Sequence, residues 1–538
     1  MGARSGAERL DPAVRLALGM GALSLVRLAL IGRTDLIPDE AYYFQWARDL
    51  AACYWDQPGG IALFHRINSA IFGATTFGVR VGAVWLSLVT TLFAYDLGKT
   101  CLGDRNRASW AALAMHTVPL LSVGAVLILH DTLLGALATA MLAFFARAVL
   151  REQRWAWYAM ALAGAAALYA KFSAVTLVPG MVVFMLLDER GRRAFRQPEP
   201  YLAGVIVAVL FTPVIAWNAK NGWVAYYAVA KLAGGGDDPN VFQSVAYQGD
   251  FIASQLLLAS PILFYGILRA VYFAFRPQPP SAQWSCGRRG RSPEPYERTP
   301  GRLLLACVTA SVLGYFLYQA TNAKVQGNWA AMAYVPGMFL VVDFWAQAWD
   351  RRRKRATWAL GLAAAMTILI QAHTARPFLP LPAKADMTAQ AHGWRDLAAR
   401  VEEELAKAGP NAAVMGRRYQ VCSELDFYLP DDVEVYCAAY ASRGSQYDIW
   451  ENYEDLVGRD VIYVNPQGHS AKLSLHFADE AELGEFVVGS PGRPYQKLQL
   501  LRLERFKLDG PLQSYFNKPF PAARGRLVHR VQTGKGEE

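Results

Sequence analysis

The chain has 538 residues, of which 54% are hydrophobic and 18% are charged, and its formal net charge is +10. From about Val14 to about Thr374, apolar stretches of roughly 17–22 residues recur, and each is long enough to cross a hydrocarbon core of ~30 Å. This pattern excludes a wholly soluble protein, although the sequence from about Lys384 onward has the composition of a soluble domain.

Hydropathy windows predict about eleven membrane-spanning helices. We place them at residues 14–32, 80–98, 109–128, 132–150, 155–170, 172–187, 201–219, 251–270, 303–320, 329–348 and 356–374. The stretch 155–187 contains Lys171 and fits either one broken helix or two short helices.

Basic residues gather in alternate loops, on the side of the membrane where the N-terminus lies. They include Arg4, Arg9, Lys99, Arg105, Arg107, Arg190, Arg192, Arg193, Arg288, Arg289, Arg302 and the run 351–355. The positive-inside rule makes this side cytoplasmic, so we expect a cytoplasmic N-terminus and a C-terminal region outside, in the periplasm. The same topology explains most of the net charge, and no nucleic-acid partner is expected, because that function needs a basic face on a folded domain.

The expected fold is an α-helical polytopic membrane domain over residues 1–378, followed by a soluble α/β domain over residues 379–538. In the second region, short apolar runs alternate with helical or turn segments. These runs are Ala412–Met415, Val433–Ala438, Val461–Val464, Phe486–Val488 and Leu498–Leu503. We expect this region to bind a partner or acceptor, or to cap the membrane domain. Its Cys422 and Cys437 either form a disulfide or remain two buried thiols.

The external loop from Thr34 to Val79 is expected to hold two helices that lie in the membrane interface. The stretch Glu40–Leu50 carries an apolar stripe at helical spacing, and a second helix is expected over Ile61–Phe72, after the break at Pro58. A second external loop, 220–250, contains a glycine run followed by Asp237 and Asp238. It is either a mobile lid over a site or a simple linker.

Unusual polar residues gather at the external ends of the predicted spans. They are Asp39, Glu40, Asp56, Gln57, His65, His130, Asp131, Lys171, Asp237, Asp238, Lys324, Gln326 and Asn328. Ionisable groups are costly at a membrane, so they indicate function by default. For Lys171 the alternative is a side chain that extends its amine to the headgroups.

A carboxylate and a cation just outside a bilayer suit a phosphate-linked lipid substrate. A lysine neutralises a phosphate as a point charge, and an acid takes the proton from an incoming hydroxyl. Sugar transfer from a polyprenyl phosphate fits this pattern, with the apolar spans supplying a groove for the prenyl chain.

Five motifs carry a resemblance to the GT-C superfamily of membrane glycosyltransferases, in particular to the family-39-like branch of protein O-mannosyltransferases and lipid A aminoarabinose transferases. They are Pro38-Asp39-Glu40-Ala41-Tyr42-Tyr43, Trp55-Asp56-Gln57-Pro58-Gly59, His130-Asp131-Thr132-Leu133-Leu134, Tyr169-Ala170-Lys171-Phe172-Ser173 and Gly327-Asn328-Trp329-Ala330. The segments Ser423–Leu429 and Gln446–Trp450 also resemble the family, with no role assigned.

The resemblance implies Asp39 as catalytic base, Asp131 as a supporting acid and Lys171 as the contact to the lipid phosphate. Further substrate-binding residues are expected among Glu40, Tyr43, Asp56, Gln57, His130, Lys324 and Asn328. Gln57 stands where aminoarabinose transferases have a lysine, which argues against aminoarabinose as the donor sugar.

The expected function is therefore an inverting glycosyltransferase of the bacterial inner membrane. It would use a polyprenyl-phosphate sugar on the periplasmic face and act on lipid A or core saccharide, on another envelope glycan, or on a protein. The sequence requires no metal or other cofactor, although two acids could also hold a divalent ion. Two alternatives are a flippase for a lipid-linked sugar and a non-catalytic scaffold. A transporter would be expected to show internal repeats and polar residues near the middle of the membrane, and the sequence shows neither pattern.

Overall fold

The computed structural model describes residues 10–233, 239–276, 298–382, 386–438, 444–451, 453–466, 473, 476–490 and 492–508. Asp237 and Asp238, in the loop predicted to be either a lid or a linker, lie outside the described residues. The chain divides into two compact units. Unit 1 comprises residues 1–31, 80–212 and 230–371, and unit 2 comprises residues 32–79, 213–229 and 372–538. The predicted domain boundary between residues 378 and 379 stays a prediction.

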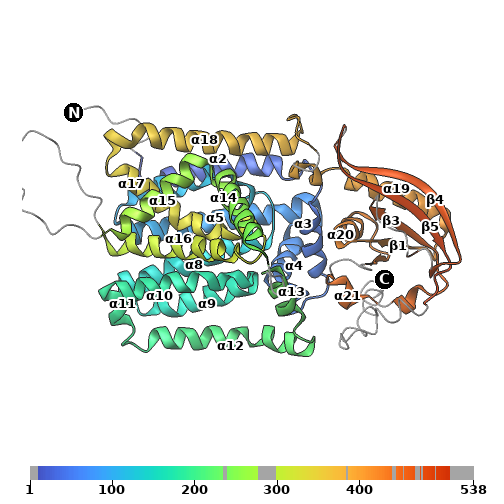
Figure 1. Ribbon diagram of the computed structural model, residues 1–538, viewed down its shortest axis with the longest axis horizontal. Helices are drawn as coiled ribbons and strands as arrows, with labels where there is room; N and C mark the ends of the chain where they lie inside the picture. Colours follow the sequence, from blue (N-terminus) through green and yellow to red (C-terminus); the bar gives the residue numbers. More distant parts are fainter. Residues whose placement is uncertain are drawn as a thin grey trace, which may run out of the picture. The chain divides into compact units, whose positions relative to one another are not determined.

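Unit 1 consists of helices (Figure 1). Among the described residues, seven helices are long and apolar enough to cross a membrane, or eight if a bent pair counts as one span. The seven are α2 (Pro12–Leu30), α5 (Thr76–Leu102), α8 (His130–Leu150), α12 (Glu199–Lys220), α16 (Pro300–Gln319), the stretch Gly327–Ala346, which includes α17 (Tyr334–Ala346), and α18 (Trp349–Ala375).

The expected span at 109–128 is not one helix. It is divided into α6 (Arg105–Ala114), the 3-10 turn η1 (Met115–Thr117) and α7 (Pro119–Val123). Pro119 causes the break, because proline lacks an N–H group and moves the preceding residue out of the helical region. Val118 accordingly has extended backbone, with φ −68° and ψ 118°.

The expected span at 251–270 also differs from a straight helix. It lies within α14 (Val241–Ala259) and α15 (Pro261–Phe275), which meet at 105°. The junction is Ser260, whose φ of 72° is unusual for a residue other than glycine, and Pro261 starts the next helix. The stretch 155–187 forms two short helices, α9 (Trp155–Ala170) and α10 (Leu177–Leu187). This is one of the two arrangements predicted from the sequence.

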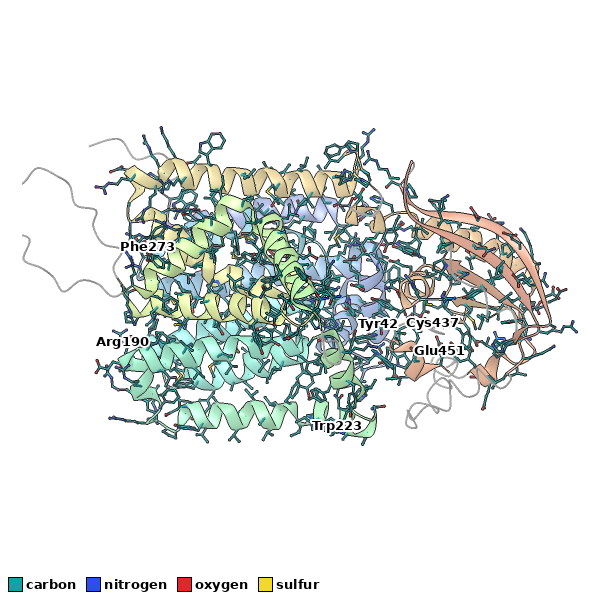
Figure 2. The ribbon with its side chains drawn as sticks, in the orientation of Figure 1. Tyr42, Arg190, Trp223, Phe273, Cys437 and Glu451 are labelled. Carbon is teal, nitrogen blue, oxygen red and sulfur yellow. The ribbon has the colours of Figure 1, made fainter. Side chains whose placement is uncertain are left out.

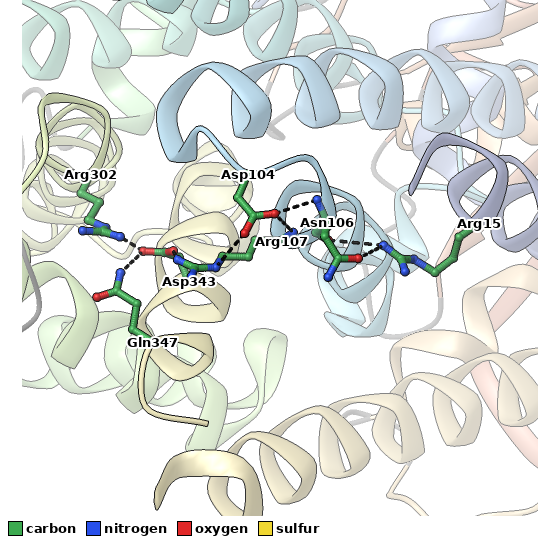
Figure 3. Close-up of polar contacts among 7 residues, drawn as sticks. All are labelled: Arg15, Asp104, Asn106, Arg107, Arg302, Asp343 and Gln347. Carbon is green, nitrogen blue, oxygen red and sulfur yellow. Dashed lines mark hydrogen bonds and ion pairs between the residues drawn. The ribbon is translucent and has the colours of Figure 1, made fainter. Parts of the chain in front are cut away.

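One end of unit 1 is held by a buried carboxylate, Asp343 of α17, which is fully buried (Figure 3). Its Oδ2 accepts hydrogen bonds from Arg302 Nε at 2.7 Å and from Gln347 Nε2 at 2.8 Å. Its Oδ1 accepts from Arg107 Nη1 at 2.8 Å. Helices α6, α16 and α17 are thereby tied through one charge.

Unit 2 contains a mixed five-stranded sheet in the order β2-β1-β3-β5-β4. Its strands are β1 (Ala413–Gly416), β2 (Val435–Cys437), β3 (Val461–Pro466), β4 (Asp479–Ser490) and β5 (Arg493–Glu504). The first three pair in parallel and the last two add antiparallel. All five apolar runs singled out in the sequence overlap these strands.

The helices of unit 2 include α3 (Pro38–Trp46), α4 (Gly60–Phe72), α19 (Trp394–Ala408), α20 (Tyr419–Tyr428) and α21 (Tyr447–Trp450). Helix α3 ends at Trp46, earlier than the expected Leu50. The hydroxyl of Tyr54 donates to the carbonyl oxygen of Trp46 at 2.8 Å, and the two rings stack at 4.2 Å. This contact satisfies a carbonyl at the end of the helix.

The buried network around Asp343 makes a prediction for stability. Asp343→Leu leaves the buried Arg302 without its carboxylate, so we expect the free energy of unfolding to fall by about 3–5 kcal/mol. SDS-induced unfolding in detergent micelles measures this change.

The matched control is Glu189→Gln, which removes the exposed pair of Glu189 with Arg193 at 3.8 Å. Its expected effect is below about 1 kcal/mol. Equal losses of the free energy of unfolding in both variants would show that the buried network stabilises the protein no more than the exposed pair does.

Candidate functional site

In unit 1, Lys171 lies in a break between helices. Helix α9 ends at Ala170, Lys171 has extended backbone (φ −162°, ψ 138°), and the 3-10 turn η2 (Phe172–Thr176) follows. Irregular backbone within an apolar stretch is tolerated where protein buries it or where it lines a cavity. The side chain of Lys171 is 11% exposed.

The amine of Lys171 is paired with a carboxylate. Its Nζ lies 2.7 Å from Oδ1 of Asp131, in the first turn of α8. The second carboxylate oxygen accepts a hydrogen bond from Nδ2 of Asn328 at 2.9 Å. His130, beside Asp131, lies with Nδ1 2.8 Å from the carbonyl oxygen of Ala170. Four of the predicted residues therefore form one cluster, and Lys171 does not extend alone to the surface.

The position of Asn328 depends on residues that the sequence analysis missed. Asn328 belongs to the 3-10 segment η3 (Gly327–Ala333). Gln255 of α14 donates from Nε2 to the carbonyl oxygen of Gly327 at 3.1 Å, and its Oε1 accepts from the hydroxyl of Tyr334 at 2.6 Å. A Cβ on Gly327 would lie 2.5 Å from Oγ of Ser254, so only glycine allows this close approach.

Lys324 is placed differently from the other predicted residues of unit 1. It is exposed and pairs with Asp250 at 3.5 Å. Among the described residues, the structure gives Lys324 no contact with the cluster of Asp131, Lys171 and Asn328. A surface ion pair of this kind contributes little to stability.

In unit 2, Asp39 and Glu40 begin helix α3 and have different environments. Glu40 is fully buried, and its Oε2 accepts from the backbone N–H of Ile37 at 3.1 Å, so it caps the helix. Asp39 is partly exposed, and its Oδ1 accepts from the hydroxyl of Tyr419 at 3.1 Å. Asp39 is thus partly exposed, whereas Glu40 is buried and makes a structural contact.

Tyr43 lies one helical turn after Asp39. Burial raises the pKa of the Tyr43 hydroxyl well above its usual value, and the charges of Asp39 and Asp56 raise it further. Both carboxylates therefore act on one phenol, which stays neutral and can donate a hydrogen bond at neutral pH. Asp39, Tyr43 and Asp56 form the second group of predicted residues.

The segment around Gln57 turns sharply. The carbonyl oxygen of Gln57 accepts from the backbone N–H of Tyr54 at 2.9 Å, which closes the turn, and from Sγ of Cys53 at 3.4 Å. The side-chain oxygen of Gln57 is buried and meets no hydrogen-bond donor among the described residues. Gln57 is therefore a candidate for contact with a polar substrate group.

Helix α20 supplies further residues that the sequence analysis could not assign. Besides Tyr419, Ser423 donates from Oγ to the carbonyl oxygen of Pro38 at 3.2 Å. The hydroxyl of Tyr428 accepts from the backbone N–H of Leu36 at 2.8 Å. These contacts hold the start of α3, and hence Asp39, against a segment about 380 residues later in the chain. The only sequence signal was the resemblance of Ser423–Leu429 to the family.

The second unassigned segment, Gln446–Trp450, also contacts the region near α3. Gln446 receives a hydrogen bond at Oε1 from the backbone N–H of Trp55 at 2.8 Å, and its own N–H donates to the hydroxyl of Tyr42 at 2.7 Å. Figure 2 labels Tyr42, together with Cys437 and Glu451 of the same unit. Cys422 and Cys437 are both buried thiols, which is one of the two alternatives drawn from the sequence.

No cluster of three or more metal-binding side chains occurs among the residues that the structure describes. The two groups of polar residues instead combine carboxylates, one ammonium, an amide and a phenol. This chemistry suits proton transfer and the binding of an anion.

Comparisons with known proteins point in the same direction. Residues 56–217 match the family model described as dolichyl-phosphate-mannose-protein mannosyltransferase. The lipid A galacturonosyltransferase RgtD of Rhizobium johnstonii is 25% identical over 419 residues, which cover 77% of this chain and 82% of that protein. The undecaprenyl phosphate-alpha-4-amino-4-deoxy-L-arabinose arabinosyl transferase of Serratia proteamaculans is 28% identical over 146 residues, 25% of this chain and 26% of that protein.

The fold is similar to that of ArnT from Cupriavidus metallidurans. The apo structure has a TM-score of 0.58 at 14% identity and covers 91% of this chain and 98% of that one. The structure bound to undecaprenyl phosphate has a TM-score of 0.57 at 15% identity and covers 90% and 97%. The family model, the curated relatives and the fold all point to the GT-C superfamily of glycosyltransferases.

The buried His65 of α4 gives a prediction for pH dependence. Neither ring nitrogen meets a hydrogen-bond partner among the described residues, and burial lowers the pKa of His65 to about 3. In the unfolded chain the pKa is about 6.5, so only the unfolded state gains a proton as the pH falls from about 6.5 toward 3. Stability is therefore lost in that window, by about 2 kcal/mol at pH 5.

The comparison of wild type with His65→Phe at pH 7 and pH 5 measures this effect. The variant should lose less stability than wild type between the two pH values, because it has no imidazole to protonate. An identical loss in both proteins would contradict the assignment of the acid sensitivity to His65.

Proposed function

We propose that the protein transfers a sugar from a polyprenyl-phosphate donor to an acceptor of the bacterial envelope, on the periplasmic face of the inner membrane. The observation that carries the proposal is the buried ammonium of Lys171 at a break between apolar helices. It is held by Asp131, whose second carboxylate oxygen accepts a hydrogen bond from Asn328. A cation in such a place suits the phosphate of a lipid whose chain lies among the helices.

The proposed reaction is a single displacement. Asp39 takes the proton from an acceptor hydroxyl, whose oxygen attacks the anomeric carbon of the donor sugar. The bond between that carbon and the phosphate oxygen breaks, and the polyprenyl phosphate leaves with the bonding electron pair. Lys171 stabilises the negative charge of the leaving phosphate, and the attack from the opposite side inverts the anomeric configuration.

In the proposed reaction, Asp131 holds the ammonium of Lys171 in place. An isolated ammonium is costly to bury, and the carboxylate offsets that cost until the donor arrives. Asn328 donates to the second oxygen of Asp131 and fixes its orientation. Tyr43, Asp56, Gln57 and His130 are proposed to contact the sugar or the acceptor. The contact of Glu40 with Ile37 favours a structural role for that residue.

Lipid A or its core saccharide is the acceptor that the relatives favour. One curated relative is named a lipid A galacturonosyltransferase, and the other is named an arabinosyl transferase. Gln57 is neutral where aminoarabinose transferases have a lysine, and this difference favours a donor sugar other than aminoarabinose. We further propose that the C-terminal region contributes to acceptor binding.

The direct test compares membranes that carry wild type or Asp39→Asn. We expect wild type to add one sugar residue to lipid A or another envelope glycan, as a mass increment that identifies the sugar. Asp39→Asn should reduce the transfer rate by about 10²–10⁴-fold, because general base catalysis contributes this much.

Glu40→Gln is the neighbouring control, and its main expected effect is on stability rather than on the chemical step. Full activity of Asp39→Asn would contradict the assignment of the base. Movement of labelled donor lipid between leaflets without any glycosylated product would contradict transfer itself.

We propose Tyr419 as a residue that positions Asp39. Tyr419→Phe removes the hydrogen bond to Asp39, and a hydrogen bond to a charged group is worth about 1.5–3 kcal/mol. We expect kcat to fall by roughly 10–100-fold with little change in KM for the donor. A variant that changes KM while kcat stays the same would contradict positioning of the base.

A further inference from the structure

A basic cavity lies at the end of unit 1 where the arginine-rich loops are found. It has a volume of about 160 Å³ and lies between α15, α17 and α18. Three arginines line it, together with large aromatic side chains and a glycine. The lining includes Tyr265, Arg269, Trp345, Arg352 and Arg355.

Two of the three cavity arginines, Arg269 and Arg352, contact a pair of stacked aromatic rings. Phe273 and Phe344 stack with centroids 5.3 Å apart and an angle of 20°. The guanidinium of Arg352 lies 3.7 Å from the centroid of Phe344, and that of Arg269 lies 5.1 Å from the centroid of Phe273. Arg276 lies 5.9 Å from the same ring. Cation–π contacts therefore hold several positive charges close together.

Among the described residues, no carboxylate lines this cavity. Asp343, next to Phe344 on α17, is already engaged with Arg107 and Arg302 (Figure 3). Neither Arg269 nor Arg355 forms an ion pair with any residue that the structure describes. Like charges gathered in this way repel one another unless an anion neutralises them.

The cavity is also open to the surroundings of the helices. Tyr265 is 61% exposed and Ile262 is 38% exposed, and both belong to the lining. Gly266 allows α15 to pack closely against Trp345, because a Cβ there would lie 2.7 Å from the Trp345 ring. The site thus combines guanidinium groups with apolar surface that an acyl chain can cover.

We propose that this cavity binds the phosphate of an anionic lipid headgroup. Guanidinium groups form paired hydrogen bonds with phosphate oxygens, and basic pockets between membrane helices on the cytoplasmic side suit such headgroups. The ligand is distinct from the donor lipid of the proposed reaction, and the proposal does not depend on transferase activity.

The test measures lipid binding to the purified full-length protein in neutral detergent. Native mass spectrometry with phosphatidylglycerol and, separately, phosphatidylcholine gives the affinity for each lipid. We expect phosphatidylglycerol to bind more tightly. The double variant Arg269→Gln/Arg355→Gln should weaken its binding by about thirtyfold, which corresponds to about fivefold for each arginine.

The control is Arg190→Gln/Arg192→Gln in α11 (Glu189–Ala194), at the same end of the helices (Figure 2). It removes as much charge and should leave binding unchanged. Arg269→Glu is a second variant that supplies a carboxylate in the cavity, and it should abolish binding while the protein keeps its thermal stability.

Three results would overturn the proposal. One is equal binding of the two lipids, and another is an equal loss in the control and in the cavity variant. The third is displacement of phosphatidylglycerol by inorganic phosphate at a similar affinity, which would assign the cavity to free phosphate rather than to a lipid.

Discussion

The ion pair of Lys171 with Asp131 is the constraint around which the core of unit 1 is arranged. An ammonium that is largely buried requires a carboxylate partner, and that partner comes from the start of another helix. Helix α9 must end at Ala170 to place Lys171, and η3 must be irregular to place Asn328. Gln255 then donates to the carbonyl oxygen of Gly327, which this irregularity leaves open, and the hydroxyl of Tyr334 holds the side chain of Gln255.

In unit 2, the orientation of Asp39 likewise depends on contacts with other segments of the chain. A general base needs a defined orientation as well as access to its substrate. Tyr419 and Ser423 of α20 bind the start of α3 from a distant part of the sequence. The charges of Asp39 and Asp56 both raise the pKa of Tyr43, beyond the effect of its burial. The C-terminal region thereby contributes directly to the surroundings of the proposed base.

Much of the helical architecture could be predicted because hydropathy windows detect long apolar stretches. The windows could not detect the breaks at Pro119 and at Ser260–Pro261, because the apolar composition continues across both. Proline in an apolar segment is the available signal, and it marks each of these interruptions.

The candidate site was predicted where motifs were short and local, as for His130 and Asp131. It could not be predicted where the partner lies far along the chain. Tyr419 reaches Asp39 across 380 residues, and Arg107 reaches Asp343 across 236. Such pairs depend on tertiary packing, which one sequence does not specify locally. For Lys324, proximity to a motif in the sequence did not place the residue in the cluster of Asp131 and Lys171. It is exposed and lies in a surface ion pair.

The role of Lys171 is tested most directly by the binding of undecaprenyl phosphate to purified wild type, Lys171→Met and Lys324→Met, measured by native mass spectrometry in detergent. We expect Lys171→Met to weaken binding by at least about tenfold, since it removes the cation proposed to contact the phosphate. Lys324→Met should bind like wild type. Equal affinity of wild type and Lys171→Met would contradict the central role of Lys171.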